Sequence, residues 1–218
     1  KHMNEIDTAL TLAKFLLQIK AIKLNPANPF TWASGLKSPI YCDNRVTLSY
    51  PQIRTFIREA FSKTCVEKFG KPDIIAGVAT GGIPQGALVA QDLGLPFCYV
   101  RSEAKSHGLN NQVEGIVTEG ASVVVIEDLV STGKSSLAAV EALRAKGAVV
   151  KGMMAIFTYG LDVAAEAFKK AQCELTTISN YDALIKTALE EFYVTDDQMQ
   201  SLLEWRKNPQ QWSDAHSI

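Results

Sequence analysis

The chain has 218 residues, a length that suits one substantial domain with a hydrophobic core. Its hydrophobic fraction of 47% and charged fraction of 21% are ordinary for a globular protein, and its net charge of −1 argues against a protein that coats nucleic acid. No apolar run approaches a membrane span and no signal peptide is recognisable, so we expect a cytoplasmic protein without membrane contact.

The first predicted element is an amphipathic helix over residues 4–20, with Asp7 and Thr8 as candidate caps. Pro26 and Pro29 are expected to end it. The two residues before Met3 are interpreted as a cloning remnant. The cysteines are far apart with no C-x-x-C pair, which predicts reduced thiols rather than a zinc site or a disulfide framework: Cys42, Cys65, Cys98 and Cys173.

The segment 30–45 has turn residues between two short strand-like runs, and its local pattern predicts a surface hairpin. A helix over 50–69 follows, with its apolar face formed by Ile53, Phe56, Ile57, Ala60, Phe61 and Val66. Residues 73–78 are predicted to form a buried strand, and the glycine-rich turn 79–84 then leads into a helix over 84–93. Such a turn suits either close packing or a backbone that approaches a ligand.

Residues 97–101 form the next predicted strand, and the polar, glycine-containing stretch 102–115 is predicted to be a long loop. Loops of this kind often cover functional sites. Its basic side chains are Lys105 and His107, beside Arg101, and each taken alone is more often solvated surface than part of a site. Residues 116–119 are predicted to form a short strand.

The most informative stretch joins a buried strand, two acids, a loop of small residues and a helix. The strand covers 123–126, Glu127 and Asp128 follow it, and residues 131–133 form the loop before a helix over 134–144. Free N–H groups and the dipole at a helix start attract phosphate. The combination predicts a site for a phosphorylated sugar, against the alternative of an ordinary turn with adjacent acids.

A nucleotide-binding P-loop is the second alternative, because Gly133, Lys134 and Ser135 look like the end of that motif. The P-loop requires a glycine where this chain has Asp128, so a nucleoside triphosphatase is disfavoured.

The remaining elements are a strand over 149–157, a helix over 161–171, an edge strand over 175–178 and helices over 181–191 and 196–205. This order predicts an α/β fold with a doubly wound, mostly parallel sheet flanked by helices. The carboxyl ends of the strands should bring 79–84, Arg101 and 127–135 to one crevice.

The stretch 123–136 resembles the phosphoribosyl-diphosphate (PRPP) signature of the type I phosphoribosyltransferases. The segment 30–45, F-x-x-x-S-G-x-x-S-P-x-Y-x-D-x-R, is similar to the hood of the orotate phosphoribosyltransferase family, and R-x-x-x-K-x-H-G from Arg101 is similar to its catalytic loop. The resemblance implies transfer of phosphoribose from PRPP to orotate with Mg²⁺ held on the substrate, and a single domain with a hood over about 3–50 and a core over 51–218.

The resemblance also implies roles for particular residues. Lys105, His107 and Asp128 would be catalytic, Ser131 would contact orotate, and the diphosphate would lie on Thr80, Gly81 and Gly82. PRPP would be bound by Arg101, Lys105, His107, Glu127, Asp128, Leu129, Val130, Ser131, Thr132, Gly133, Lys134 and Ser135. The family's catalytic loop reaches the neighbouring subunit's site, which implies a homodimer.

Four positions depart from the common family pattern: Ala33, Gly81 and Ser102 replace basic residues, and Glu127 replaces an aspartate. They leave the partner of the orotate carboxylate open, with Arg45 and Lys37 as candidates. The alternatives to an orotate enzyme are a phosphoribosyltransferase for a purine or uracil and a PRPP-sensing regulator. The regulator reading expects a DNA-binding region, and the sequence has no recognisable one.

Overall fold

The computed structural model describes residues 3–103 and 112–217. Its main sheet has six strands in the order β10-β9-β8-β5-β6-β7. Its strands are β5 (Ile74–Val78), β6 (Phe97–Val100), β7 (Val113–Glu114), β8 (Ser122–Val130), β9 (Val149–Thr158) and β10 (Leu175–Thr177). All neighbouring strands are parallel except β6 and β7. From β5 the chain first adds β6 and β7 on one side of the sheet and then β8, β9 and β10 on the other. This arrangement confirms the predicted doubly wound, mostly parallel sheet.

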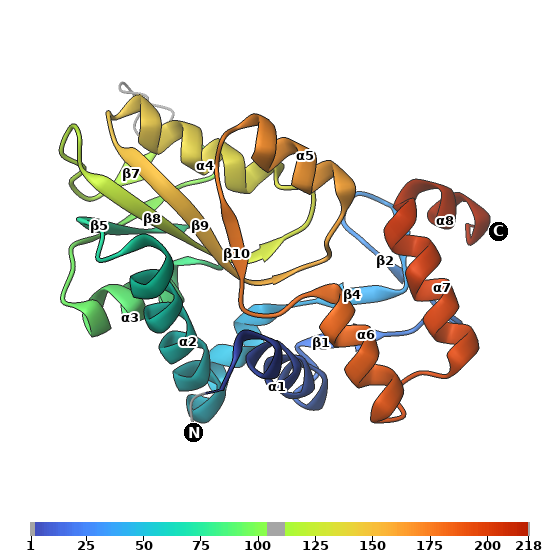
Figure 1. Ribbon diagram of the computed structural model, residues 1–218. Helices are drawn as coiled ribbons and strands as arrows, with labels where there is room; N and C mark the ends of the chain where they lie inside the picture. Colours follow the sequence, from blue (N-terminus) through green and yellow to red (C-terminus); the bar gives the residue numbers. More distant parts are fainter. Residues whose placement is uncertain (1–2, 104–111, 218) are drawn as a thin grey trace.

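Helices cover both faces of this sheet, as Figure 1 shows. One face is covered by α4 (Lys134–Ala145) and α5 (Asp162–Lys170), and the other by α2 (Pro51–Phe69) and α3 (Ile83–Leu93). Each layer has its own apolar core, one around Val125, Leu143 and Phe168 and the other around Phe61 and Ile126. The near-continuous apolar runs of β5 and β8 follow from this burial on both faces.

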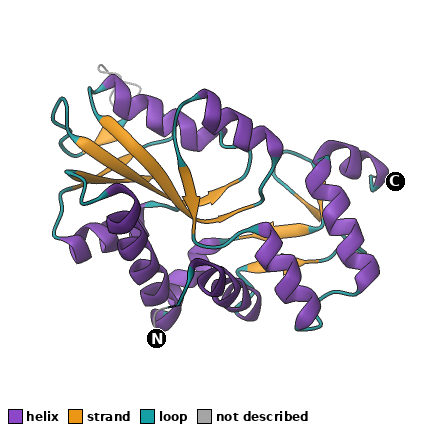
Figure 2. Cartoon of the chain, viewed as in Figure 1, coloured by secondary structure: helices purple, strands orange, loops and turns teal. Residues whose placement is uncertain are grey.

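A smaller region lies beside the sheet and contains two short strand pairs (Figure 2). Strand β1 (Ile22–Leu24) pairs with β4 (Ile40–Cys42), and β2 (Phe30–Thr31) pairs with β3 (Lys37–Ser38) as the predicted hairpin. The other elements are α1 (Glu5–Gln18), the 3₁₀ helix η1 (Asn44–Ser49), α6 (Tyr181–Glu190), α7 (Asp196–Lys207) and α8 (Pro209–Ala215). Helices α1 and α6 pack side by side in Figure 1.

The N-terminal helix differs from its prediction at both ends. Its cap is Asn4, whose Oδ1 accepts the Asp7 N–H at 2.8 Å, because asparagine is as good a cap as aspartate and lies one turn earlier. The helix ends at Gln18, well before Pro26, since Lys20 takes a left-handed conformation (φ 59°) that turns the chain into β1.

Two strands after residue 100 also differ from their predicted positions. The predicted strand at 116–119 is wrong, because β7 forms at Val113–Glu114 instead, inside the stretch predicted to be entirely loop. Strand β8 continues to Val130, beyond the predicted end at Ile126, because β9 pairs with it as far as Thr158. The two acids therefore lie within the end of the strand.

Two details of the helices were also missed. Val66 is 47% exposed although it was assigned to the buried face of α2. Helix α8 was not predicted, because a seven-residue helix carries little periodic signal, but Trp212 anchors it in the core. No helix among the described residues is both long and apolar enough to cross a membrane.

Candidate functional site

The glycine turn after β5 and the acids of β8 line one cavity of about 280 Å³, which we call the acidic cavity. Its lining residues are Ala79, Thr80, Gly81, Glu127, Asp128, Leu129, Ser131, Thr132, Gly133, Ser135 and Ser136. Two segments about 50 residues apart in the sequence thus meet at the carboxyl ends of parallel strands, which is where open α/β sheets bind their ligands. Arg101 follows the end of β6, the strand next to β5.

The N-terminus of α4 gives this cavity its anion-binding character. Gly133 precedes the helix with φ 85° and has no side chain that could cap it, and the Lys134 N–H has only a long contact of 3.5 Å to the Thr132 hydroxyl. A Cβ at Gly133 would lie 2.8 Å from the Phe168 ring, so the position requires glycine for both conformation and space. The N–H groups of the first turn, together with the hydroxyls of Thr132 and Ser135, suit a phosphate.

The two acids are held in different ways. Glu127 is 5% exposed, and its carboxylate accepts hydrogen bonds from the Ser136 hydroxyl at 2.8 Å and the Asp128 N–H at 2.9 Å. Burial, and then the neighbouring Asp128 carboxyl, raise the pKa of Glu127 well above its usual value. The Asp128 Oδ1 atom accepts the Leu129 N–H at 2.9 Å, and its carboxylate lies directly against Gly81.

A second cavity of about 280 Å³, the aromatic cavity, adjoins the first. It is lined by Thr31, Trp32, Ala33, Tyr41, Cys42, Leu129, Ser131 and Tyr159. Leu129 and Ser131 line both cavities, so the two share one wall at the end of β8. The Trp32 and Tyr159 rings stack with centroids 5.6 Å apart, which suits a planar ligand beside a phosphorylated one.

The structure brings most of the predicted site residues together in these cavities. Gly82, Val130 and Lys134 lie in the same segments without lining either one, and Arg101 forms an ion pair with Glu114 (Nη1–Oε1, 3.7 Å). Lys105 and His107 lie outside the described residues. Arg45 is ion-paired with Asp43 (2.8 Å), which lowers the pKa of that carboxyl.

Sequence reasoning missed several residues of the site. Ser136, which holds Glu127, was assigned only to the start of the helix, although a serine at a buried helical position is a signal of a polar partner. Trp32 and Tyr159 gave no local signal, because the fold alone brings these two distant residues together.

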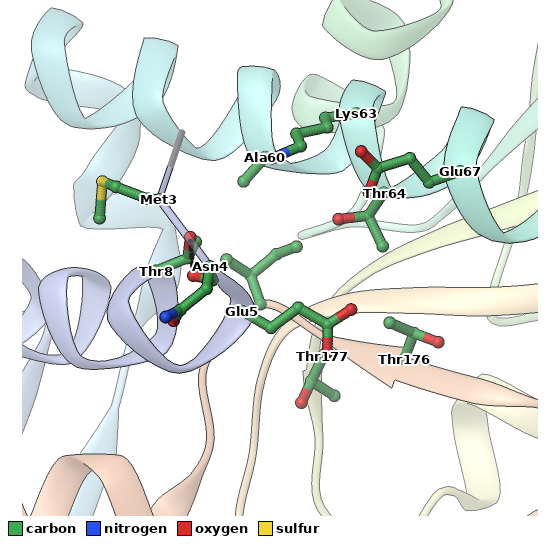
Figure 3. Close-up of a pocket in the computed structure, with 11 residues that line it drawn as sticks. Met3, Asn4, Glu5, Thr8, Ala60, Lys63, Thr64, Glu67, Thr176 and Thr177 are labelled. Carbon is green, nitrogen blue, oxygen red and sulfur yellow. Dashed lines mark hydrogen bonds between the residues drawn. The ribbon is translucent and has the colours of Figure 1, made fainter. Parts of the chain in front are cut away.

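A further cavity, of about 310 Å³, lies away from these residues between α1, α2 and β10 (Figure 3). Glu5 and Thr8 of α1, Lys63 and Glu67 of α2, and Thr177 of β10 line it. Of the residues predicted for the site, none that the structure describes lines it.

The phosphoribosyl transferase domain profile matches residues 48–191. The chain is 60% identical over 200 residues to the orotate phosphoribosyltransferase of Phocaeicola vulgatus, covering 92% of this chain and 94% of that one. The chain belongs to the orotate phosphoribosyltransferase family.

Solved structures agree with this family. Orotate phosphoribosyltransferase from Aeropyrum pernix has a TM-score of 0.73 at 28% identity, covering 84% of this chain and 99% of its own. The Mycobacterium tuberculosis orotate phosphoribosyltransferase in complex with PRPP has a TM-score of 0.64 at 21% identity, covering 81% and 98%, which shows the shared fold. The fold of these structures thus agrees with the sheet described above.

Proposed function

We propose that this protein transfers the 5-phosphoribosyl group from PRPP to orotate, giving orotidine 5′-monophosphate and diphosphate in pyrimidine nucleotide synthesis. The observation that carries the proposal is the wall shared by the acidic and aromatic cavities at Leu129 and Ser131. This wall supports the proposal because a cavity suited to a phosphorylated sugar adjoins one suited to a planar ring. The 60% identity to an enzyme named for this reaction supports it.

In this proposal the 5′-phosphate lies on the backbone and hydroxyls of residues 130–135, at the N-terminus of α4. Asp128 acts on the ribose, where its carboxylate holds a hydroxyl and offsets the positive charge that develops at C1. Glu127 supports Asp128 by accepting its N–H. Ser131, in the shared wall, contacts the base.

The leaving diphosphate would lie on the turn formed by Thr80, Gly81 and Gly82, and Arg101, Lys105 and His107 would neutralise its charge. The polar side chains that line the acidic cavity present oxygen atoms, and Mg²⁺ prefers oxygen ligands. The cavity therefore suits Mg²⁺ carried on the oxygens of PRPP. Bound in that way, Mg²⁺ supplies charge neutralisation of the diphosphate.

We further propose a cytoplasmic homodimer in which residues 3–50 form the hood and each subunit's loop completes its partner's site. The four free cysteines among the described residues agree with a reducing compartment.

We place the orotate carboxylate at Lys37 rather than Arg45. The Lys37 Nζ donates a 2.7 Å hydrogen bond to the Thr31 hydroxyl, and Thr31 lines the aromatic cavity. The Arg45 guanidinium, in contrast, has a partner in Asp43. The charge of Lys37 is therefore beside the base site, while that of Arg45 is already offset.

Matched substitutions test this placement. Lys37→Met should raise the KM for orotate about tenfold, because charged hydrogen bonds contribute about 1.5–3 kcal/mol, whereas the KM for PRPP should change little. Arg45→Met should change either KM less than about threefold, as for most surface ion pairs. Steady-state kinetics with each substrate varied measures both, and the reverse ranking would assign the carboxylate to Arg45.

The proposed function is tested by the loss of orotate absorbance on mixing the protein with PRPP and Mg²⁺, with uracil, hypoxanthine and adenine in parallel reactions. Orotate consumption that requires both PRPP and Mg²⁺ is the expected result. Turnover of another base alone would contradict the assigned base and retain the PRPP site. PRPP binding without turnover of any base would favour a regulator.

A further inference from the structure

Asn44 connects the hood to the acids of β8. It is the first residue of η1, separated from the end of β4 by Asp43 alone, and is 2% exposed. Its Nδ2 donates a 2.9 Å hydrogen bond to the backbone oxygen of Asp128, across 84 positions of sequence. This contact joins the hood to the backbone of the residue to which the proposed function gives the ribose chemistry.

The Asp128 carbonyl needs such a donor because no strand among the described residues pairs with it on that edge. The pairing of β5 with β8 ends at Gly77 and Ile126. Backbone oxygens two residues apart face the same strand edge, and the Ile126 oxygen faces Gly82 on the β5 side. Asn44 therefore takes the place of a neighbouring strand at Asp128, where an unpaired buried carbonyl would be costly.

Cys42 fixes the orientation of the Asn44 amide. Its Sγ donates to Asn44 Oδ1 at 3.3 Å, which leaves Nδ2 directed to Asp128. Burial, and then the Asp128 and Asp43 carboxylates, raise the pKa of the thiol well above its usual value, so it keeps its proton as a donor at neutral pH. Cys42 also lines the aromatic cavity, so these contacts run from the base site to the ribose site.

We propose that Asn44 is a positioning residue that holds Asp128 in place for the transfer step, and that Cys42 acts through it by setting the amide orientation. This inference rests on the proposed function, since it assigns Asp128 to the ribose. Asn44 itself bonds the backbone of Asp128 and not its carboxylate, which stays in the wall of the acidic cavity.

Asn44→Leu tests the first part, because leucine is similar in size and cannot hydrogen-bond. A misplaced Asp128 should lower kcat about 10- to 100-fold. The affinity for Mg²⁺–PRPP, measured by calorimetry, should fall about fivefold, which corresponds to one hydrogen bond of about 1 kcal/mol.

Ser179→Ala is the matched control. The buried Ser179 hydroxyl donates to the Ala9 backbone oxygen at 2.7 Å, so this variant also loses a buried bond from side chain to backbone, far from the acids in sequence and outside both cavities. Its Tm should fall as that of Asn44→Leu does, with kcat and PRPP affinity unchanged. If Asn44→Leu behaves like this control in kcat and PRPP affinity, Asn44 is only structural and the proposal fails.

Two substitutions at Cys42 test the second part. Cys42→Ser keeps a donor and should retain kcat within about threefold, whereas Cys42→Ala removes the donor and should lower kcat about three- to tenfold. In the double variant with Asn44→Leu, the loss should equal that of Asn44→Leu alone, because Cys42 acts through the amide. Additive losses, or equal kcat for Cys42→Ser and Cys42→Ala, would overturn the role of Cys42.

PRPP affinity separates this inference from the proposed function. A wild-type protein that binds PRPP without consuming orotate would refute the function alone. The calorimetric comparison of Asn44→Leu with Ser179→Ala would still decide whether Asn44 positions Asp128: weaker binding by Asn44→Leu supports it, and equal binding overturns it. Cys42→Ala gives the same comparison if Asn44→Leu fails to fold.

Discussion

At the scale of single residues, Glu127 and Asp128 share a strand end but have different surroundings. Glu127 is enclosed, with its carboxylate engaged by Ser136 and by the Asp128 N–H. The Asp128 carboxylate lies against Gly81 in the wall of the acidic cavity. We therefore expect substitutions of Glu127 to act mainly on the structure of the strand end, and substitutions around Asp128 to act on turnover.

The stability conferred by Glu127 should depend on pH. Its pKa in the folded protein is raised above the usual 4.5, so this carboxyl destabilises the fold progressively as pH rises from about 4.5 through the raised pKa. Glu127→Gln cannot ionise, and its free energy of unfolding relative to wild type should increase over that range, on top of a constant loss of one hydrogen bond.

Urea unfolding of both proteins between pH 4.5 and 8 measures this difference. A difference between Glu127→Gln and wild type that stays constant with pH would contradict the prediction.

Gly81→Ala should impair turnover more than stability. A Cβ at this position would overlap the Asp128 carboxylate, and that side chain can rotate away at modest cost. We expect kcat to fall about 10- to 100-fold, as for other displaced catalytic groups, with a Tm change of a few degrees. Kinetics and thermal melting measure the two effects, and an unchanged kcat would show that this carboxylate orientation is not required.

At the scale of secondary-structure elements, the short helix α8 supports the hood. The Ser213 hydroxyl of α8 accepts the backbone N–H of Lys37 in β3 at 2.8 Å, and both Ser213 and Trp212 are buried. Strand β3 also carries the Lys37 side chain that reaches Thr31 beside the aromatic cavity. The last helix of the described chain thus positions one wall of the proposed base site.

Ser213→Ala should weaken base binding selectively. It removes the acceptor for a backbone N–H, which costs about 1 kcal/mol, and loosens β3. Since about 1.4 kcal/mol corresponds to a tenfold change in affinity, the KM for orotate should rise about three- to fivefold. The KM for PRPP should stay within about twofold of wild type. Ser201→Ala is the control, since Ser201 bonds the Trp212 indole (3.1 Å) without reaching β3; equal effects of the two would contradict the prediction.

At the scale of the whole molecule, an aromatic cluster joins the hood, the sheet and the C-terminal helices. Trp205 of α7 is 1% exposed and its ring packs edge-on against Trp32 (5.7 Å) and Tyr159 (5.3 Å) and at a tilt against Tyr181 (5.6 Å). These residues come from regions far apart in the chain. The cluster therefore contributes to the contact between the hood and the rest of the fold.

Trp205→Ala should destabilise the protein by about 3–5 kcal/mol, the usual cost of removing a large buried ring. Phe192→Ala, at a ring that is 92% exposed, should change stability by less than about 0.5 kcal/mol. Urea unfolding followed by circular dichroism measures both. A loss below about 1 kcal/mol in Trp205→Ala would show that the cluster contributes little to the fold.

The sequence predicted the central sheet and the acidic cavity because both depend on local signals. Apolar runs mark β5 and β8, and small residues follow each of them before a helix. The aromatic cavity depends on long-range packing, so Tyr159 and Trp32 could not be paired in advance. The role of Asn44 could not be predicted for the same reason, because its hydrogen-bond partner Asp128 is 84 positions away.

The two outermost strands of the sheet are short, at three residues for β10 and two for β7. Long, exposed edge strands are templates on which another chain can add a strand and begin to aggregate, and very short ones offer few free backbone groups for this. Among the described residues, both ends of the sheet therefore offer a poor template for edge-to-edge polymerisation. We accordingly expect two copies to pair through side-chain surfaces rather than through one continuous sheet.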